Sequence, residues 1–140
     1  MTPKEECERI LDALLQFAEK QLKKHGAFYP YGAVLRTDGS IVLTAYADER
    51  TEFPDPNHMI QGLTKLHKKE AEEGRIKASG IAWDAKVTTD HGQKTDAVIV
   101  SLEHIDHYAV VVGQPYRIGM FQKLKLGEIF AQEGKHEIFD

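Results

Sequence analysis

The sequence predicts an α+β domain in which a single five-stranded antiparallel sheet is flanked by helices, in the order α-β-β-α-β-β-β followed by a C-terminal element. Two segments repeat apolar residues at helical spacing, and an Asp-Gly pair separates two short apolar runs. Three long apolar runs then follow one another with short polar connections: Ile76–Val87, Thr95–Glu103 and Tyr108–Tyr116. A chain of 140 residues fits one globular domain spanning residues 1–140.

The first helix is predicted to begin at Thr2-Pro3-Lys4-Glu5, which offers a hydroxyl N-cap, a proline at the first helical position and a glutamate that completes a capping box. Its apolar stripe includes Cys7, and glycine after His25 favours a left-handed end at Gly26. Because Cys7 lies on this stripe, we interpret it as a small core residue rather than a nucleophile.

A hairpin is predicted where Ala33–Arg36 and Ile41–Tyr46 flank an Asp-Gly turn, with positive φ at both central residues. Residues 47–56 contain two prolines and predict an exposed acidic loop. A second amphipathic helix is expected from about Pro56 to Glu73, capped by Asp55-Pro56 and ended by Gly74.

The first two long runs are predicted to form a hairpin through the seven-residue connection Thr88–Lys94. Symmetric looping of that connection places Lys86 opposite Asp96 and Trp83 opposite Ile99, and the opposite charges of Lys86 and Asp96 favour this register.

A four-residue turn, His104–His107, is predicted to join the second and third runs and to set Leu102 opposite Ala109 and Val100 opposite Val111. In this register both faces of the sheet are apolar in the middle, so both need cover. The two helices cover one face each, or both lie on one face and leave the other for a partner.

The C-terminal residues 117–140 mix apolar residues with glycines and charges. We expect an extended piece near Lys123–Leu126 and a short helical turn at Gly127–Gln132.

Composition limits the function classes. The 18 basic and 22 acidic residues give a net charge of −4 with no basic stripe, which argues against a nucleic-acid partner. A single cysteine forms no internal disulfide, and no window is long and apolar enough for a membrane helix. We therefore expect a cytoplasmic protein with no membrane or nucleic-acid partner.

One polar group raises the possibility of a small-molecule site or an enzyme. Asp84, Lys86, Asp96 and Glu103 lie beside apolar strands, where burial could shift the pKa of an acid–base pair. Cross-strand pairing of Lys86 with Asp96 is the structural alternative. No nucleophile elbow or phosphate loop is present, so we predict no catalytic residues and no cofactor.

A metal site at Glu103–His107 is a weak alternative. His104 and His107 lie close in sequence, but tetrahedral zinc needs three or four ligands on a rigid frame. A solvated polar turn with Asp106 as turn former is the simpler interpretation, so no metal is predicted.

Aromatic residues suggest binding more than catalysis. Phe28, Tyr29 and Tyr31 lie on a bend with proline and glycine and cannot all point inward, so we take them as candidate interface residues; core packing of two of the three is the alternative. Tyr116 and Arg117 end the last long strand and could recognise a carboxylate or stack on a partner.

Several short motifs resemble the sparse pattern of a group of small bacterial proteins of unknown function, over about Phe28 to Ala131. The motifs are Phe28–Gly32, Asp38-Gly39, Lys94–Ala97, Leu102–His104 and Pro115-Tyr116. The element order is similar to the roadblock and profilin-like layout. That resemblance implies a five-stranded antiparallel sheet with helices on its two faces, in proteins that act as interaction or regulatory modules.

The function we predict is a non-catalytic protein–protein interaction or regulatory module that self-associates as a homodimer. The alternative is the small-molecule or enzyme site described above. A weaker alternative is an immunity-type partner of a bacterial effector.

Overall fold

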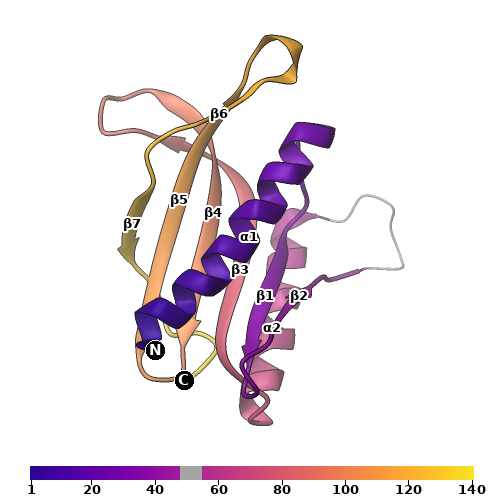
Figure 1. Cartoon of the computed structure of the whole chain (residues 1–140), viewed down its shortest axis with the longest axis vertical. Coiled ribbons are helices and arrows are strands. Elements are labelled where there is room, and N and C mark those ends of the chain that lie inside the picture. Colours follow the sequence, from indigo (N-terminus) through magenta and orange to yellow (C-terminus); the bar gives the residue numbers. More distant parts are fainter. Residues whose placement is uncertain (48–54) are drawn as a thin grey trace.

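A computed structural model describes residues 1–47 and 55–140, so most of the predicted acidic loop lies outside the described residues. It has an α+β architecture with helices α1 and α2 and one open antiparallel sheet (Figure 1). The elements are α1 Pro3–His25, β1 Tyr31–Arg36, β2 Ile41–Thr44, α2 Pro56–Glu72, β3 Ile76–Thr88, β4 Lys94–His104, β5 Tyr108–Ile118, the 3₁₀ turn η1 Met120–Gln122, β6 Leu124–Leu126 and β7 Phe130–Glu133. The strand order is β2-β1-β3-β4-β5-β6, and β7 also pairs with β5.

The sheet has seven strands rather than the predicted five, because the C-terminal segment adds two. The extended piece is confirmed as β6, but the helical turn predicted at Gly127–Gln132 is wrong, since Phe130 opens β7. Tyr116 pairs with Leu126 and Gly113 pairs with Phe130, so one extra residue lies between β6 and β7. The two short strands are thus one edge strand interrupted by a bulge, which satisfies backbone groups of β5.

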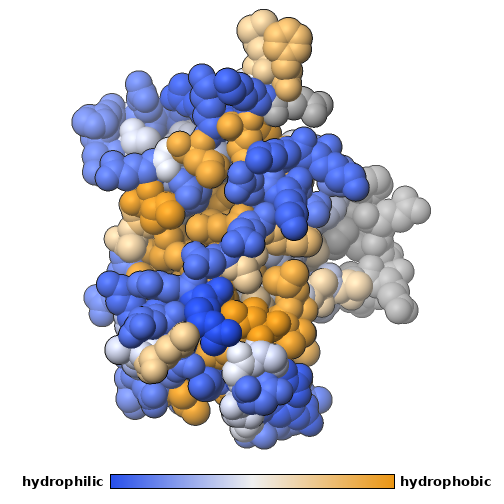
Figure 2. Space-filling view, in the orientation of Figure 1, coloured by the Kyte–Doolittle hydropathy of each residue, from blue (hydrophilic) through white to orange (hydrophobic). Residues whose placement is uncertain are grey.

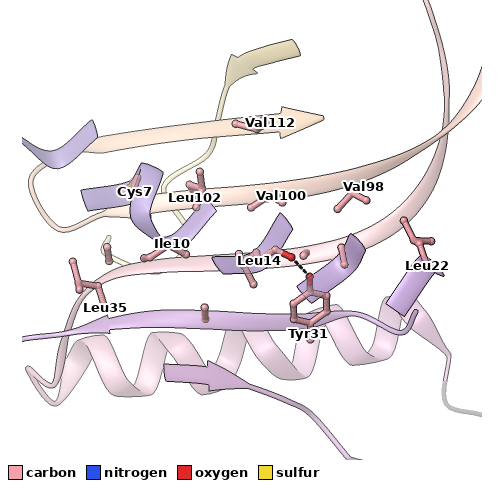
Figure 3. Close-up of a cluster of buried hydrophobic side chains, with 14 of the residues drawn as sticks. Cys7, Ile10, Leu14, Leu22, Tyr31, Leu35, Val98, Val100, Leu102 and Val112 are labelled. Atoms are coloured by element: carbon pink, nitrogen blue, oxygen red, sulfur yellow. Dashed lines mark hydrogen bonds between the residues drawn. The ribbon is translucent and has the colours of Figure 1, made fainter. Parts of the chain in front are cut away.

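The predicted caps of α1 are confirmed. The Thr2 hydroxyl accepts a hydrogen bond from the Glu5 backbone N–H, the Glu5 side chain accepts one from the Thr2 N–H, and Gly26 ends the helix with a φ of 74°. The apolar stripe of α1 packs on one face of the sheet (Figure 3). The main core consists of Cys7, Ile10, Leu14, Ala18, Leu22, Tyr31, Ala33, Leu35, Ala78, Ala82, Val98, Val100, Leu102, Val112 and Tyr116.

Helix α2 covers the opposite face, where it contacts β1 and β3 (Figure 1). Its bounds agree with prediction, although Asp55 makes no side-chain cap, and Met59, Leu63 and His67 are its buried residues. One helix therefore lies on each face, the first of the two arrangements expected. The C-terminal residue Ile138 is also buried and extends the cover beyond α2.

The β1–β2 and β3–β4 hairpins, whose turns contain Asp38-Gly39 and His91-Gly92, have the same turn geometry. The backbone N–H of Gly39 donates to Arg36 O and that of Arg36 to Ser40 O, and Gly39 has a φ of 92°. Asp38 does not have positive φ, so the prediction of two left-handed central residues is wrong. The geometry is a three-residue loop with glycine at its left-handed position. The same pattern recurs at 89–93 around Gly92, so the β3–β4 connection has five residues rather than seven.

The β3–β4 register is confirmed, with Lys86 opposite Asp96 and Trp83 opposite Ile99. The β4–β5 register is wrong by one residue. His104 belongs to β4 and pairs with Tyr108, leaving a three-residue turn in which His107 takes a φ of 62°.

The observed β4–β5 pairs are Val100 with Val112 and Leu102 with Val110. A left-handed residue that is not glycine gives little signal in the sequence, which is why the predicted turn was one residue too long. The shift places Val110 and Val112, rather than Val111, on the face covered by α1.

Gly80 in β3 permits the close approach of α1. A Cβ atom at this position would lie 2.6 Å from Ile10 Cγ2 and 2.7 Å from Leu14 Cδ1, both on fully buried side chains. We expect Gly80→Ala to lower the free energy of unfolding by about 1–3 kcal/mol because the core has no room for a methyl group. Urea unfolding measures this. Gly119→Ala is the matched control: its φ is −92° and the nearest atom to its Cβ is 3.7 Å away, so no loss is expected there. If the two variants were equally stable, the close packing of α1 against Gly80 would be contradicted.

Candidate functional site

The aromatic bend contributes mainly to the core. Tyr31 is 6% exposed, its hydroxyl donates a hydrogen bond to the Leu14 carbonyl, and burial raises the pKa of the phenol. The rings of Phe17 and Phe28 lie 4.7 and 5.7 Å from the Tyr31 ring. Only Tyr29 is exposed, at 52%. Of the three predicted interface aromatics, Tyr31 lies in the core and Phe28 packs against it, as the alternative interpretation expected.

The structure brings Asp84, Asp96 and Tyr116 together on the α1 face. Tyr116 is the register partner of Asp96, and its hydroxyl donates to Asp84 Oδ1 at 2.7 Å. Burial raises the pKa of Asp84, and the Asp96 carboxylate raises it further. The pKa of Tyr116 is raised by burial and by its bond to Asp84. Lys86 is exposed opposite Asp96.

This arrangement has a structural explanation. Asp84 lies in β3 and Tyr116 in β5, so their hydrogen bond spans the intervening strand β4 and ties three strands together. The Tyr116 side chain is only 4% exposed and is committed to Asp84, which leaves little surface for a ligand.

Glu103 is separated from the other members of the predicted polar site. In β4 it lies seven positions from Asp96, so the two side chains point to opposite faces of the sheet. The Glu103 carboxylate accepts hydrogen bonds from three successive backbone N–H groups, those of Glu137 at 2.8 Å, Ile138 at 3.0 Å and Phe139 at 2.6 Å. Its role in the fold is to hold the C-terminal segment against the α2 face.

The Glu103 contacts predict the effect of Glu103→Gln. An amide keeps one acceptor oxygen but turns an N–H₂ group toward backbone donors, so we expect a loss of about 2–3 kcal/mol in unfolding free energy. Hydrogen exchange at the Ile138 amide, which the carboxylate protects, should accelerate with it. Glu137→Gln is the control, since that side chain is exposed. Unchanged exchange at Ile138 in the Glu103 variant would show that the carboxylate does not hold the segment.

A buried ionic cluster, which sequence reasoning missed, joins α1 to the sheet. The backbone N–H of Asp106 donates to His104 Nδ1 at 3.0 Å, so His104 Nε2 carries the proton and donates to Glu6 Oε1 at 3.1 Å. Lys77 Nζ lies 2.8 Å from Glu6 Oε2. Hydrogen bonds from Lys77 and then His104 lower the pKa of Glu6 despite its burial. A sequence signal existed: Glu6 stands four residues before Ile10, in line with the apolar stripe.

The two weak metal candidates have different surroundings. His104 is 2% exposed and both of its ring nitrogens are engaged, whereas His107 is exposed in the turn. Within the ranges 1–47 and 55–140, no group of three or more His, Cys, Asp or Glu side chains could hold a metal ion.

A second polar cluster, also missed, lies under α2. His67 is fully buried, with Nδ1 2.7 Å from Ser79 Oγ and Nε2 2.8 Å from Thr44 Oγ1. The sequence signal is that His67 follows Leu63 by four residues on the buried stripe. A small cavity of about 60 Å³ adjoins Ser79 and is also lined by Trp83.

A serine beside a histidine could be a nucleophile with its base. However, burial lowers the pKa of His67 to about 4, so its imidazole is a poor proton acceptor at neutral pH, and Ser79 is itself only 2% exposed. The cluster is better explained as the polar link that positions α2. Cys7 is equally unsuited to nucleophilic attack, because burial raises the pKa of its thiol to about 12.

The His67 environment predicts a pH dependence of stability. The pKa of His67 is about 4 in the folded chain and about 6.5 when unfolded, so below pH 6.5 the unfolded chain takes up a proton that the folded chain refuses. Stability should fall as the pH drops from about 6.5 to about 4, by up to about 3 kcal/mol, and this contribution should then level off. Urea unfolding across this range measures it.

His67→Gln should remove that part of the slope, while His91→Gln, at an exposed histidine, should keep it. A wild-type slope that persists in the His67 variant would assign the effect to other groups.

Other features on the surface of the described residues include a groove and the two edges of the sheet. A groove of about 900 Å³ lies between the β3–β4 turn and the β6–β7 edge. Its lining mixes Arg117 and Lys125 with Asp90 and Glu128, and apolar residues such as Phe130. Because the lining carries both charges, it selects no one class of small molecule.

The two sheet edges differ. The outer edge of β5 is closed by β6 and β7, which carry a bulge and, at Lys125, a lysine. The other edge is β2, and its four residues, Ile41–Thr44, include no charge and no proline. Val42 is 39% exposed and Leu43 is 48% exposed. Strand β2 therefore lacks the charged residues, the proline and the bulge that natural proteins use to prevent strand pairing, and among those features it has only a short length of four residues.

Comparison with family models, with curated proteins and with solved structures finds no match to this chain. The resemblance to small bacterial proteins and to the roadblock layout stays a prediction.

Proposed function

We propose that this protein is a non-catalytic interaction module that self-associates through strand β2. The observation that carries the proposal is the edge of the sheet at Ile41–Thr44, which has no charged residue, proline or bulge and exposes Val42 and Leu43. An edge strand presents unpaired N–H and C=O groups along its outer side, and it binds another strand by the same hydrogen bonds that build a sheet.

The pairing of β2 with β1 indicates what a second copy would cover. Val42 pairs with Val34 on the α2 face, and Leu43 pairs with Ala33 on the α1 face. An antiparallel contact between two β2 strands about a two-fold axis would join two sheets and bury one exposed apolar side chain on each face.

The internal polar clusters support a role without catalysis. Glu103 binds the C-terminal segment, Glu6 binds His104 and Lys77, and His67 binds Ser79. Among the described side chains, every buried nitrogen and oxygen atom has a hydrogen-bond partner. These groups are therefore engaged within the fold instead of being directed at a substrate.

Self-association is tested by the mass of the particle in solution. Sedimentation equilibrium at micromolar concentration should give twice the chain mass of 15.8 kDa for the wild type. Val42→Lys with Leu43→Lys should give a monomer, because charged side chains on an edge strand oppose pairing. Ile129→Lys is the control, since Ile129 is 47% exposed between β6 and β7, at the opposite edge of the sheet from β2.

The double variant keeps its core, because both side chains are exposed, and its circular dichroism spectrum should match that of the wild type. A monomeric wild type, or a double variant that stays dimeric, would contradict the proposal.

A further inference from the structure

We propose that the hairpin between β5 and β6 is a contact site for an anionic lipid bilayer surface. This inference goes beyond the proposed function, and the hairpin lies at the opposite edge of the sheet from β2. The apex of the hairpin carries Met120 and Phe121, and basic residues from two separate segments flank it.

The apex exposes two large apolar side chains. Met120 is 81% exposed and Phe121 is 95% exposed. The hairpin closes with a hydrogen bond from the Gly119 N–H to Lys123 O, and it extends beyond the rest of the sheet in Figure 1. Figure 2 shows apolar side chains projecting from the same end of the molecule, above a largely hydrophilic surface. Apolar side chains at a projecting apex can enter an adjoining apolar phase, such as the interior of a bilayer.

The backbone at Phe121 is unfavourable for a phenylalanine. Its φ of 61° and ψ of 28° fall in the left-handed region, which bulky residues rarely occupy. Glycine or asparagine would adopt this conformation at lower cost. The chain thus has a strained and fully exposed aromatic where a small polar residue would be more stable, and strain of this kind is typical of a binding position.

Basic residues surround the apex. Residues 116–126 contain Arg117, Lys123 and Lys125 and no acidic residue. The end of α1, residues 20–26, adds Lys20, Lys23 and Lys24, again with no acidic residue. The two segments meet, because a Cβ on Gly26 would lie 4.0 Å from Ile118 Cδ1. Lys23 is partly neutralised by Glu19 at 3.0 Å. In a chain of net charge −4, the hairpin and the end of α1 therefore concentrate positive charge, and the acidic residues Asp90 and Glu128 line the same groove as Arg117 and Lys125.

One cross-strand pair also indicates an anionic ligand. Arg117 and Lys125 are direct register partners and both are exposed. Like charges directly opposite one another destabilise a sheet, and a bound anion would relieve that repulsion. Lipid phosphate and serine headgroups provide such anions on a surface that also accepts apolar side chains.

The shape of the site favours a bilayer over a folded protein partner. A convex apolar tip with a cationic flank fits a flat surface that is deformable, apolar within and anionic outside. A protein would need a matching pocket. The sequence predicted no membrane partner because it predicts no span, and neither helix in the described ranges is long and apolar enough to cross a membrane. Contact at the surface needs no span.

Vesicle co-sedimentation tests the proposal with the full chain. Vesicles of equal parts phosphatidylcholine and phosphatidylserine should bind the wild type, and vesicles of pure phosphatidylcholine should not. Arg117→Gln with Lys123→Gln and Lys125→Gln should weaken binding about a hundredfold, since each basic residue near an anionic surface contributes roughly fivefold. Lys4→Gln with Lys65→Gln and Lys69→Gln is the matched control: it removes the same charge from exposed positions on the two helices, away from the apex, and should bind as the wild type does.

The apolar apex is tested separately. Met120→Ser with Phe121→Ser should weaken binding about tenfold or more. Ile105→Ser is the control, since Ile105 is 47% exposed in the β4–β5 turn. Phe121→Asn should also weaken binding while its melting temperature stays equal to or above that of the wild type, which separates lost binding from lost folding.

Three results would overturn the proposal. The first is a wild type that binds neither vesicle. The second is a serine double variant that binds anionic vesicles as tightly as the wild type, which would mean attraction by charge without insertion. The third is that the two serine substitutions convert the wild-type dimer to a monomer while neither protein binds vesicles. That result would make the hairpin a protein contact. The Val42 and Leu43 variant should bind anionic vesicles even when monomeric, so failure of the β2 proposal and failure of this one are distinguishable.

Discussion

The structure depends on one constraint: the three long central strands are apolar on both faces, so neither face can be left to water. Helix α1 covers one face and α2, with the C-terminal segment, covers the other. Gly80 sets how closely α1 approaches, and Phe130 lies over Gly113 at the far edge. Strands β6 and β7 close the outer edge of β5.

The three covering segments are each fixed by one buried polar cluster. Glu6 fixes α1 through His104 and Lys77, His67 fixes α2 through Ser79, and Glu103 fixes the C-terminal residues. Apolar contacts are not directional, whereas hydrogen bonds require one relative position of donor and acceptor. The clusters therefore determine where each segment sits on a surface that would otherwise accept several positions.

The features predicted correctly from the sequence all have local signals. The caps of α1, the extent of α2 and the β3–β4 register follow from nearby residues, with Lys86 opposite Asp96 as a check. The β4–β5 register was missed because His107 occupies a conformation that its residue type does not announce. Strand β7 was missed because its pairing depends on a distant glycine, Gly113, which leaves space for the Phe130 ring.

The candidate site residues show the same division. Asp84, Asp96 and Tyr116 were selected as polar or aromatic residues beside apolar strands, and they do meet. Glu103 was grouped with them although its strand position directs it to the other face. The contact between Glu6 and His104 joins residues 98 positions apart, so the first helix to be synthesised has no sheet to cover until most of the chain exists. During synthesis, much of its apolar stripe stays uncovered until β3, β4 and β5 are made, so α1 reaches its native packing only after elements far along the chain have formed.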